Sequence, residues 1–307
     1  MSKSTPFKNV LLIGAGGSIG SVVFAALLAE PSLSVTVLKR ESSHAILPSH
    51  VPSVTVPDSY PTDKLIEAFR GHDVIVCCMT TLSVTDQFRF IDAAIAAGVR
   101  RYVPSEYGLN NMNPDAQALN AVFRSKAAVQ TYLRERAAEG KIEWMSITCG
   151  MWIRWSMAHD FLGMRIRKKE FTLYDEGEGR FSVTTEENTA LALINALTKK
   201  PAETKNWNVL LSELVTTPKE LLAEIERQMG EKLTIDRIDS FTKISELQQS
   251  YADGDDAAVY GLIEAGFVTG RYGADLEKEG ELFNEVLGLK PHTLEEIVAD
   301  ALANFKK

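Results

Sequence analysis

A glycine-rich segment near the N-terminus has the composition and spacing needed to bind a phosphate group. It contains both a Gly-x-Gly and a Gly-x-x-Gly-x-x-Gly spacing, and its residues are Gly14, Ala15, Gly16, Gly17, Ser18, Ile19 and Gly20. An apolar run, expected to be a strand, precedes it, and a helical pattern follows. Glycine lets the backbone approach an anion, and a helix N-terminus presents free N–H groups to it. This context favours binding of a dinucleotide over a purely structural turn.

The end of the next expected strand bears on which dinucleotide binds. The chain there reads Lys39, Arg40, Glu41. The planar guanidinium of Arg40 suits a phosphate monoester, and Lys39 adds positive charge, so these residues favour NADP(H). In the alternative interpretation both basic side chains are solvated, and Glu41 binds the ribose hydroxyl of NAD(H).

A lysine falls on the expected inward face of a helix. Asn113 as N-cap and Pro114 at the first helical position predict a helix that runs to about Glu139. Lys126 lies within its apolar stripe, which consists of Leu119, Val122, Phe123, Val129 and Leu133. Either the amine reaches an edge along its apolar stem, or it occupies a polar site. In the second case desolvation lowers its pKa and makes it a usable proton donor near neutrality.

The elements that must position these residues alternate along the first half of the chain. The expected strands are Val10–Ile13, Ser34–Leu38, Val51–Val56, Val74–Cys78, Tyr102–Val103 and Ile142–Ile147. The helices expected between them are Ile19–Leu28, Asp63–Phe69 and Ser83–Ala97. Strands with so little polar alternation are typical of a parallel sheet covered on both faces. The order predicts an α/β fold, a Rossmann-type doubly wound sheet, whose ligands bind at the carboxyl ends of the strands beside Thr80 and Thr81.

The second half has a different character and predicts a smaller α+β domain that binds substrate. We expect residues 1–154 to form the nucleotide-binding domain and residues 155–307 the second domain, with segments near 181–213 returning to the first. Capping boxes at Thr217 and Thr293 predict helix starts. Aromatic and thioether side chains follow the sixth strand and could line a pocket for a flat substrate, or equally could pack as core: Met151, Trp152, Trp155 and His159.

Composition excludes several classes of protein. The chain has 307 residues, 45% hydrophobic and 24% charged, and a net charge of −8. This is ordinary globular composition, and an acidic chain with no basic block is not expected to bind nucleic acid or a membrane. The histidines and cysteines lack the spacing of metal ligands, so no metal is expected. Three cysteines, two of them adjacent, argue against disulfides and predict a cytoplasmic protein.

Taken together, these motifs resemble the NmrA-like, isoflavone-reductase-like branch of the atypical short-chain dehydrogenases. The matching features are the three glycines, Arg40, Asp86-Gln87, the segment Pro104-Ser105-Glu106-Tyr107-Gly108, and Lys126. Tyr107 departs from the family pattern, in which Phe is usual. The likeness is good over about the first 150 residues and loose beyond residue 200.

The resemblance implies an NADP(H)-dependent reductase of a small aromatic or phenolic molecule. Lys126 would donate a proton while hydride passes from the cofactor, and it could also hold the nicotinamide ribose. Some members of this family bind the cofactor without turnover, so the alternative is an NADP(H)-sensing regulator that binds a protein partner. A homodimer is compatible with either function.

Overall fold

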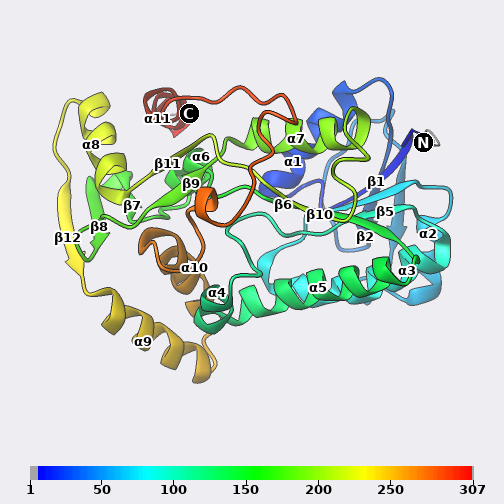
Figure 1. Cartoon of the computed structure of the whole chain (residues 1–307), viewed down its shortest axis with the longest axis horizontal. Coiled ribbons are helices and arrows are strands. Elements are labelled where there is room, and N and C mark those ends of the chain that lie inside the picture. Colours follow the sequence, from blue (N-terminus) through cyan, green and yellow to red (C-terminus); the bar gives the residue numbers. More distant parts are fainter. Residues whose placement is uncertain (1–5, 306–307) are drawn as a thin grey trace.

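The computed structural model describes residues 6–305 and contains a seven-stranded, all-parallel sheet. Its strand order is β10-β6-β5-β4-β1-β2-β3 (Figure 1). The strands are β1 (Asn9–Ile13), β2 (Ser34–Arg40), β3 (Ser53–Val56), β4 (Val74–Cys77), β5 (Arg101–Val103), β6 (Glu143–Thr148) and β10 (Trp207–Leu210). The order reverses between β1 and β4, which confirms the predicted doubly wound sheet. In sheets of this kind ligands bind at the point of reversal.

Helices cover both faces of this sheet because the strands are apolar on both sides. Val10 and Leu12 of β1 join one core with helices α1 (Ser18–Ala29) and α7 (Glu186–Thr198). Leu11 and Ile13 join the opposite core. The helices that cover this opposite face are α2 (Thr62–Phe69), α3 (Gln87–Ala97) and α5 (Ala121–Ala138). Figure 1 shows the two helical layers on opposite sides of the sheet.

Two helices predicted as continuous are each divided in the structure. The prediction of one helix from Asn113 to Glu139 is wrong, because Asn120 is extended (φ −143°) between α4 (Pro114–Leu119) and α5. The Asn120 side chain accepts from the N–H of Val122 and donates to the carbonyl of Val259 at 3.0 Å, so it begins a second helix. Likewise, a 3₁₀ turn, η1 (Thr81–Asp86), precedes α3.

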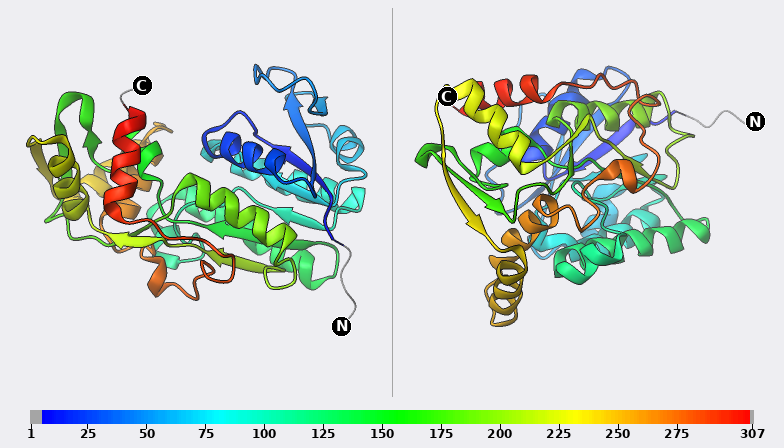
Figure 2. Two further views of the ribbon diagram at one scale, coloured as in Figure 1. Left: turned by 90° about the horizontal axis from the view of Figure 1, so that it is seen from above. Right: turned by 60° about the vertical axis from the view of Figure 1, so that its left-hand side comes forward.

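The remaining elements gather beside the large sheet (Figure 2). A three-stranded sheet has the order β12-β8-β7, and β9 pairs with β11 in antiparallel fashion. These strands are β7 (Met164–Arg165), β8 (Glu170–Tyr174), β9 (Phe181–Val183), β11 (Leu214–Thr216) and β12 (Thr234–Ile238). The helices are α6 (Ile153–Ala158), η2 (Ile166–Lys168), α8 (Pro218–Met229), α9 (Ser240–Ala252), α10 (Ala258–Val268), η3 (Leu276–Lys278) and α11 (Leu294–Phe305).

Two helix starts in this half follow their local sequence signals. Thr217 and Glu220 form a reciprocal capping box at α8, which ends at Gly230 in the left-handed region (φ +71°). Thr293 and Glu296 bond in the same reciprocal way at the start of α11. Both predicted capping boxes are confirmed.

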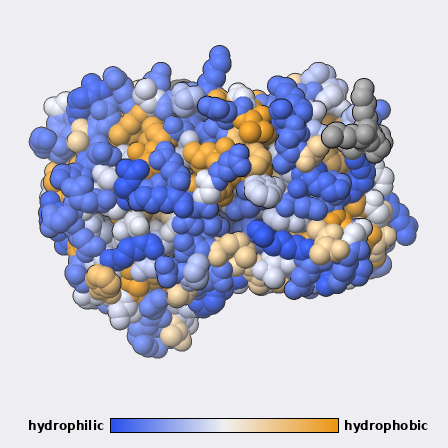
Figure 3. Space-filling view, in the orientation of Figure 1, coloured by the Kyte–Doolittle hydropathy of each residue, from blue (hydrophilic) through white to orange (hydrophobic). Residues whose placement is uncertain are grey.

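On the face shown in Figure 3 hydrophilic residues predominate, and apolar residues gather mainly in its upper part. Among residues 6–305, no helix has the length and apolar character that a bilayer crossing requires. The division at residue 154 stays a prediction, although β10 lies in the large sheet and α7 packs beside α1.

Candidate active site

The glycine turn joins β1 to α1 by a backbone path that side chains would block. Gly14 has φ +86°, and a β-carbon there would overlap the carbonyl of Cys78. A β-carbon on Gly20 would overlap the carbonyl of Gly14, which accepts from the N–H of Gly17 at 3.0 Å. Gly16, Gly17 and Ser18 are exposed, whereas Ile19 is buried and anchors the helix. The N-terminus of α1 is therefore open to an anion.

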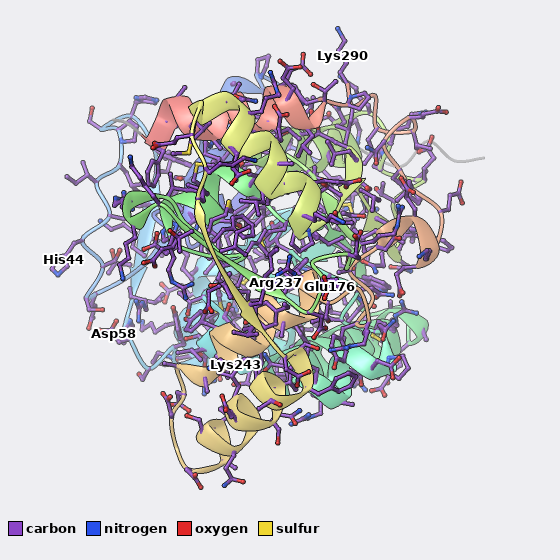
Figure 4. All side chains as sticks on the ribbon, turned by 90° about the vertical axis from the view of Figure 1, so that its left-hand side faces the viewer. His44, Asp58, Glu176, Arg237, Lys243 and Lys290 are labelled. Carbon is purple, nitrogen blue, oxygen red and sulfur yellow. The ribbon has the colours of Figure 1, made fainter. Side chains whose placement is uncertain are left out.

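The predicted phosphate ligand at the end of β2 is available to solvent. The Arg40 side chain is 54% exposed, and its nearest acidic partner is Asp58, at 3.9 Å. Figure 4 shows Asp58 and His44 at the same outer edge of the molecule. Lys39 is half-buried on the same strand. An exposed pair at this separation is weak, so Arg40 can turn to a phosphate at little cost.

The ends of β4 and β5 meet and hold a loop in place. Gln87 is fully buried, and its side chain accepts from the N–H of Ser105 at 2.8 Å. The hydroxyl of Ser105 donates to the carbonyl of Met79 at 3.0 Å. Thr80 is exposed and Thr81 half-buried at the start of η1. These bonds fix the chain on which Glu106 and Tyr107 follow.

Lys126 lies on the inward side of α5 and points at this loop. Its Nζ donates to the carbonyl oxygens of Glu106 at 2.7 Å and Tyr107 at 3.2 Å. Burial lowers the pKa of the Lys126 amine, and the carboxylate of Glu106 opposes that effect. The amine therefore occupies a polar site, which is the second of the two interpretations of its spacing.

A buried carboxyl group lies beside the amine. Glu106 has no exposed surface, and one of its oxygens, Oε2, accepts from the amide of Asn111 at 2.9 Å. Burial raises the pKa of Glu106 to about 7, against the lowering influence of Lys126 and Asn111. The site thus pairs a carboxyl and an amine whose pKa values have moved toward neutrality, a pattern common where protons are exchanged.

Cys78 and Tyr107 connect the glycine turn to Lys126. The β-carbon of Cys78 would lie 3.4 Å from a β-carbon on Gly20, and its Sγ is 3.5 Å from the hydroxyl of Tyr107. Tyr107 in turn accepts from Lys126 through its carbonyl. Burial raises the pKa of the Cys78 thiol to about 12, so it stays neutral at physiological pH. A continuous set of contacts therefore joins the expected diphosphate site to the amine.

The aromatic residues after β6 divide between core and surface. Met151 is buried in the core of the second half. Trp152 is half-buried, donates to the hydroxyl of Thr189 at 3.0 Å and lies 6.1 Å from the ring of Tyr107. Trp155 stacks on exposed His159 with ring centroids 4.5 Å apart. Trp152, Trp155 and His159 therefore keep part of their ring surface exposed, whereas Met151 contributes mainly to packing. Their role in a substrate pocket stays a prediction.

One contact across the two halves was not expected from the sequence. The indole N–H of Trp155 donates to the hydroxyl of Ser18 at 3.1 Å, across 137 positions of the chain. This bond brings α6 to the first turn of α1. No local pattern signals it, because the bond depends on how two distant segments pack. Asn111 was also missed, since only the folded loop places it against Glu106.

The fold and this site define a doubly wound α/β protein of the Rossmann type with a basic residue after β2 and a half-buried lysine at the strand ends. The model of the NmrA-like family matches residues 6–298. The chain belongs to the NmrA-like family.

Fungal proteins are among its similar relatives. It is 30% identical to "Oxidoreductase aprR" of Aspergillus flavus over 96% of this chain and 98% of that protein. It is 27% identical to "Oxidoreductase poxI" of Penicillium oxalicum, over 94% and 92%.

Solved structures share the fold at lower identity. An isoflavone reductase superimposes with a TM-score of 0.73 at 20% identity, covering 96% of this chain and 99% of that one. A leucoanthocyanidin reductase from Vitis vinifera, solved in a binary complex with NADPH, gives 0.73 at 18% identity, with the same coverage. The predicted family and fold are confirmed.

Proposed function

We propose that this protein is an NADPH-dependent reductase of a small aromatic or phenolic molecule, with Lys126 as the proton donor. The chain is an NADP(H)-dependent oxidoreductase: the names of its relatives describe oxidoreductases, and solved structures that share its fold were determined with NADPH. The observation that carries the finer proposal is the position of Lys126. Its amine is held at the strand ends and is joined by Cys78 and Tyr107 to the glycine turn.

The residues fit NADP(H) at each end of the expected binding path. Gly14 and Gly20 let the turn pack against the carbonyls of Cys78 and Gly14, where β-carbons would overlap, and the open N-terminus of α1 suits a diphosphate. Arg40 would bind the 2′-phosphate, with Lys39 beside it. When bound, the cofactor supplies a hydride. Thr80 and Thr81 lie where they can contact the nicotinamide end.

Lys126 would place its proton on the substrate atom that becomes negative as hydride is received. Two main-chain carbonyls fix the amine, and burial makes the proton easier to release. The nicotinamide ribose is a second group that the amine can bind. The stacked pair of half-buried Trp155 and exposed His159, together with Trp152, supports a flat aromatic substrate.

The names of the relatives favour turnover over a regulator that only senses NADP(H), because those names describe oxidoreductases. A cytoplasmic location and a homodimer stay predictions.

The test uses purified protein, NADPH and a panel of enones, aryl ethers, imines and ketones that carry aromatic rings. We expect consumption of NADPH, followed at its near-ultraviolet absorbance, with at least one class. Binding of NADPH without turnover of any class, together with capture of a defined protein partner, would support the sensor instead.

A further inference from the structure

Glu106 contacts Lys126 through its main chain, and its carboxyl group lies in the same buried loop without an ion pair to Nζ. Its carbonyl oxygen accepts the shorter of the two hydrogen bonds from Nζ, at 2.7 Å. Its carboxyl group is fully buried in the same loop and influences the charge state of the amine. The side chain is held by Asn111, whose amide donates to Oε2 and, at 3.4 Å, to the Glu106 carbonyl.

Two oxygen atoms in this cluster lack a partner. Glu106 Oε1 and Asn111 Oδ1 are both buried and accept no hydrogen bond from residues 6–305. A buried carboxylate with one hydrogen bond is costly unless an opposite charge lies close by. Lys126 is the cation that lowers that cost, and it acts on Glu106 more strongly than Asn111 does.

The other groups that face the pair carry no charge at physiological pH. Cys149, at the end of β6, is near enough to Lys126 to influence it, and burial raises the pKa of its thiol to about 12. Burial likewise raises the pKa of the Tyr107 hydroxyl and of the Cys78 thiol beside it. The charge of Lys126 is therefore set mainly by the balance between burial and Glu106.

We propose that Glu106 is a positioning residue for Lys126: its main-chain carbonyl fixes the amine, and its buried carboxylate keeps the amine protonated. This inference rests on the proposed role of Lys126 as proton donor. An amine at this depth without Glu106 would lose its proton more readily and arrive at the reaction uncharged. The geometry adds Glu106 and its support Asn111 to the residues that tune the proposed proton transfer.

The test reads the proton on Lys126 directly and needs no substrate. Protein labelled with ¹³C at lysine Cε is titrated by NMR, and the Lys126 resonance is assigned as the one absent from Lys126→Arg. We expect Glu106→Gln to lower the titration midpoint of Lys126 by about one pH unit or more, a tenfold change in the proton equilibrium.

The matched control is Glu264→Gln. Glu264 is a half-buried carboxyl whose pKa is also raised by burial, but it accepts from the Tyr174 hydroxyl and the Gly163 N–H rather than lying beside Lys126. We expect this variant to leave the Lys126 midpoint unchanged. Glu106→Asp keeps the negative charge and the main-chain carbonyl. Its Lys126 midpoint should therefore lie at least halfway from the Glu106→Gln value back to the wild-type value.

The wild-type protein provides a second reading should Glu106→Gln fail to fold. The Lys126 resonance should show an additional inflection near pH 7, where Glu106 ionises. A folded Glu106→Gln protein with an unchanged Lys126 midpoint would overturn the proposal. So would a wild-type titration curve with a single step and no inflection. Neither result depends on turnover, so failure here is distinguishable from failure of the proposed reductase activity.

Discussion

The glycine turn follows β1, the cluster of Lys126, Glu106 and Asn111 lies beyond the end of β5, and β4 separates these two strands. The two regions are built in opposite ways. The turn is exposed at Gly16, Gly17 and Ser18 and is defined by its backbone path. The cluster is defined by side chains, and its carboxyl group has no exposed surface. Water can satisfy the free N–H groups of the turn until an anion displaces it, whereas exclusion of water shifts the pKa values in the cluster. Anion binding and proton transfer therefore require different environments within one site.

The largest expected effect is a loss of turnover without a matching loss of NADPH affinity, which would separate the two regions by function. Lys126→Met removes the amine and should lower turnover about 10²–10⁴-fold, as loss of a general acid does. NADPH affinity should change little, because the turn is intact. Steady-state kinetics and calorimetry measure the two quantities. Lys141→Met, at an exposed lysine that pairs with Glu139, is the control. Turnover that survives in Lys126→Met would remove the proton-donor role.

The burial of Glu106 predicts a dependence of stability on pH. The pKa of Glu106 is raised from its ordinary value of 4.5 to about 7, so between these pH values the folded state keeps a proton that the unfolded state has released. The free energy of unfolding should therefore fall as the pH rises through this range, by about 3 kcal/mol at most. Glu106→Gln should lack this decline.

Urea midpoints at pH 5 and pH 8 test this directly. The exposed Glu176, which pairs with Arg237 on the face shown in Figure 4, provides the control variant Glu176→Gln. It should decline with pH as the wild type does. An equal decline in Glu106→Gln would show that the carboxyl group is not the source.

A matched pair of glycine variants tests whether the turn depends on its backbone path. Gly20→Ala places a methyl group against the carbonyl of Gly14 and should cost about 1–3 kcal/mol as well as weaken NADPH binding. Gly16→Ala meets only the side chain of Ala45, at 3.2 Å, and should cost less. Thermal unfolding with and without NADPH compares the stability and the NADPH binding of the two variants. Equal losses in both variants would mean that neither stability nor NADPH binding needs the close approach at Gly20.

The smallest effect concerns the contact between the second half and the turn. Trp155→Phe removes the bond to Ser18 and should cost about 1 kcal/mol, the usual worth of one hydrogen bond. Because the Trp155 indole contacts the first turn of α1, the variant should also lose most of the change in tryptophan fluorescence that NADPH causes. The control variant Trp207→Phe changes a half-exposed residue on β10 and should keep this fluorescence change. A full response in Trp155→Phe would place the indole away from the cofactor.

Local sequence signals predicted the strands because buried parallel strands are continuous apolar runs, as at Val74–Cys77. They also predicted the inward position of Lys126. They missed the helix break at Asn120, because the bond to Val259 that stabilises it spans 139 positions. They left the role of Glu106 open, since a charged residue in a loop is normally exposed. The missed features depend on how loops and distant segments pack in the folded chain, which no local signal records.

The most direct test of the account is a calorimetric titration of the wild-type protein with NADPH and with NADH. If the open turn holds the diphosphate and Arg40 the 2′-phosphate, NADPH should bind at least about tenfold more tightly, and Arg40→Gln should remove most of that preference. Equal affinity for the two nucleotides, or no binding of NADPH, would contradict it.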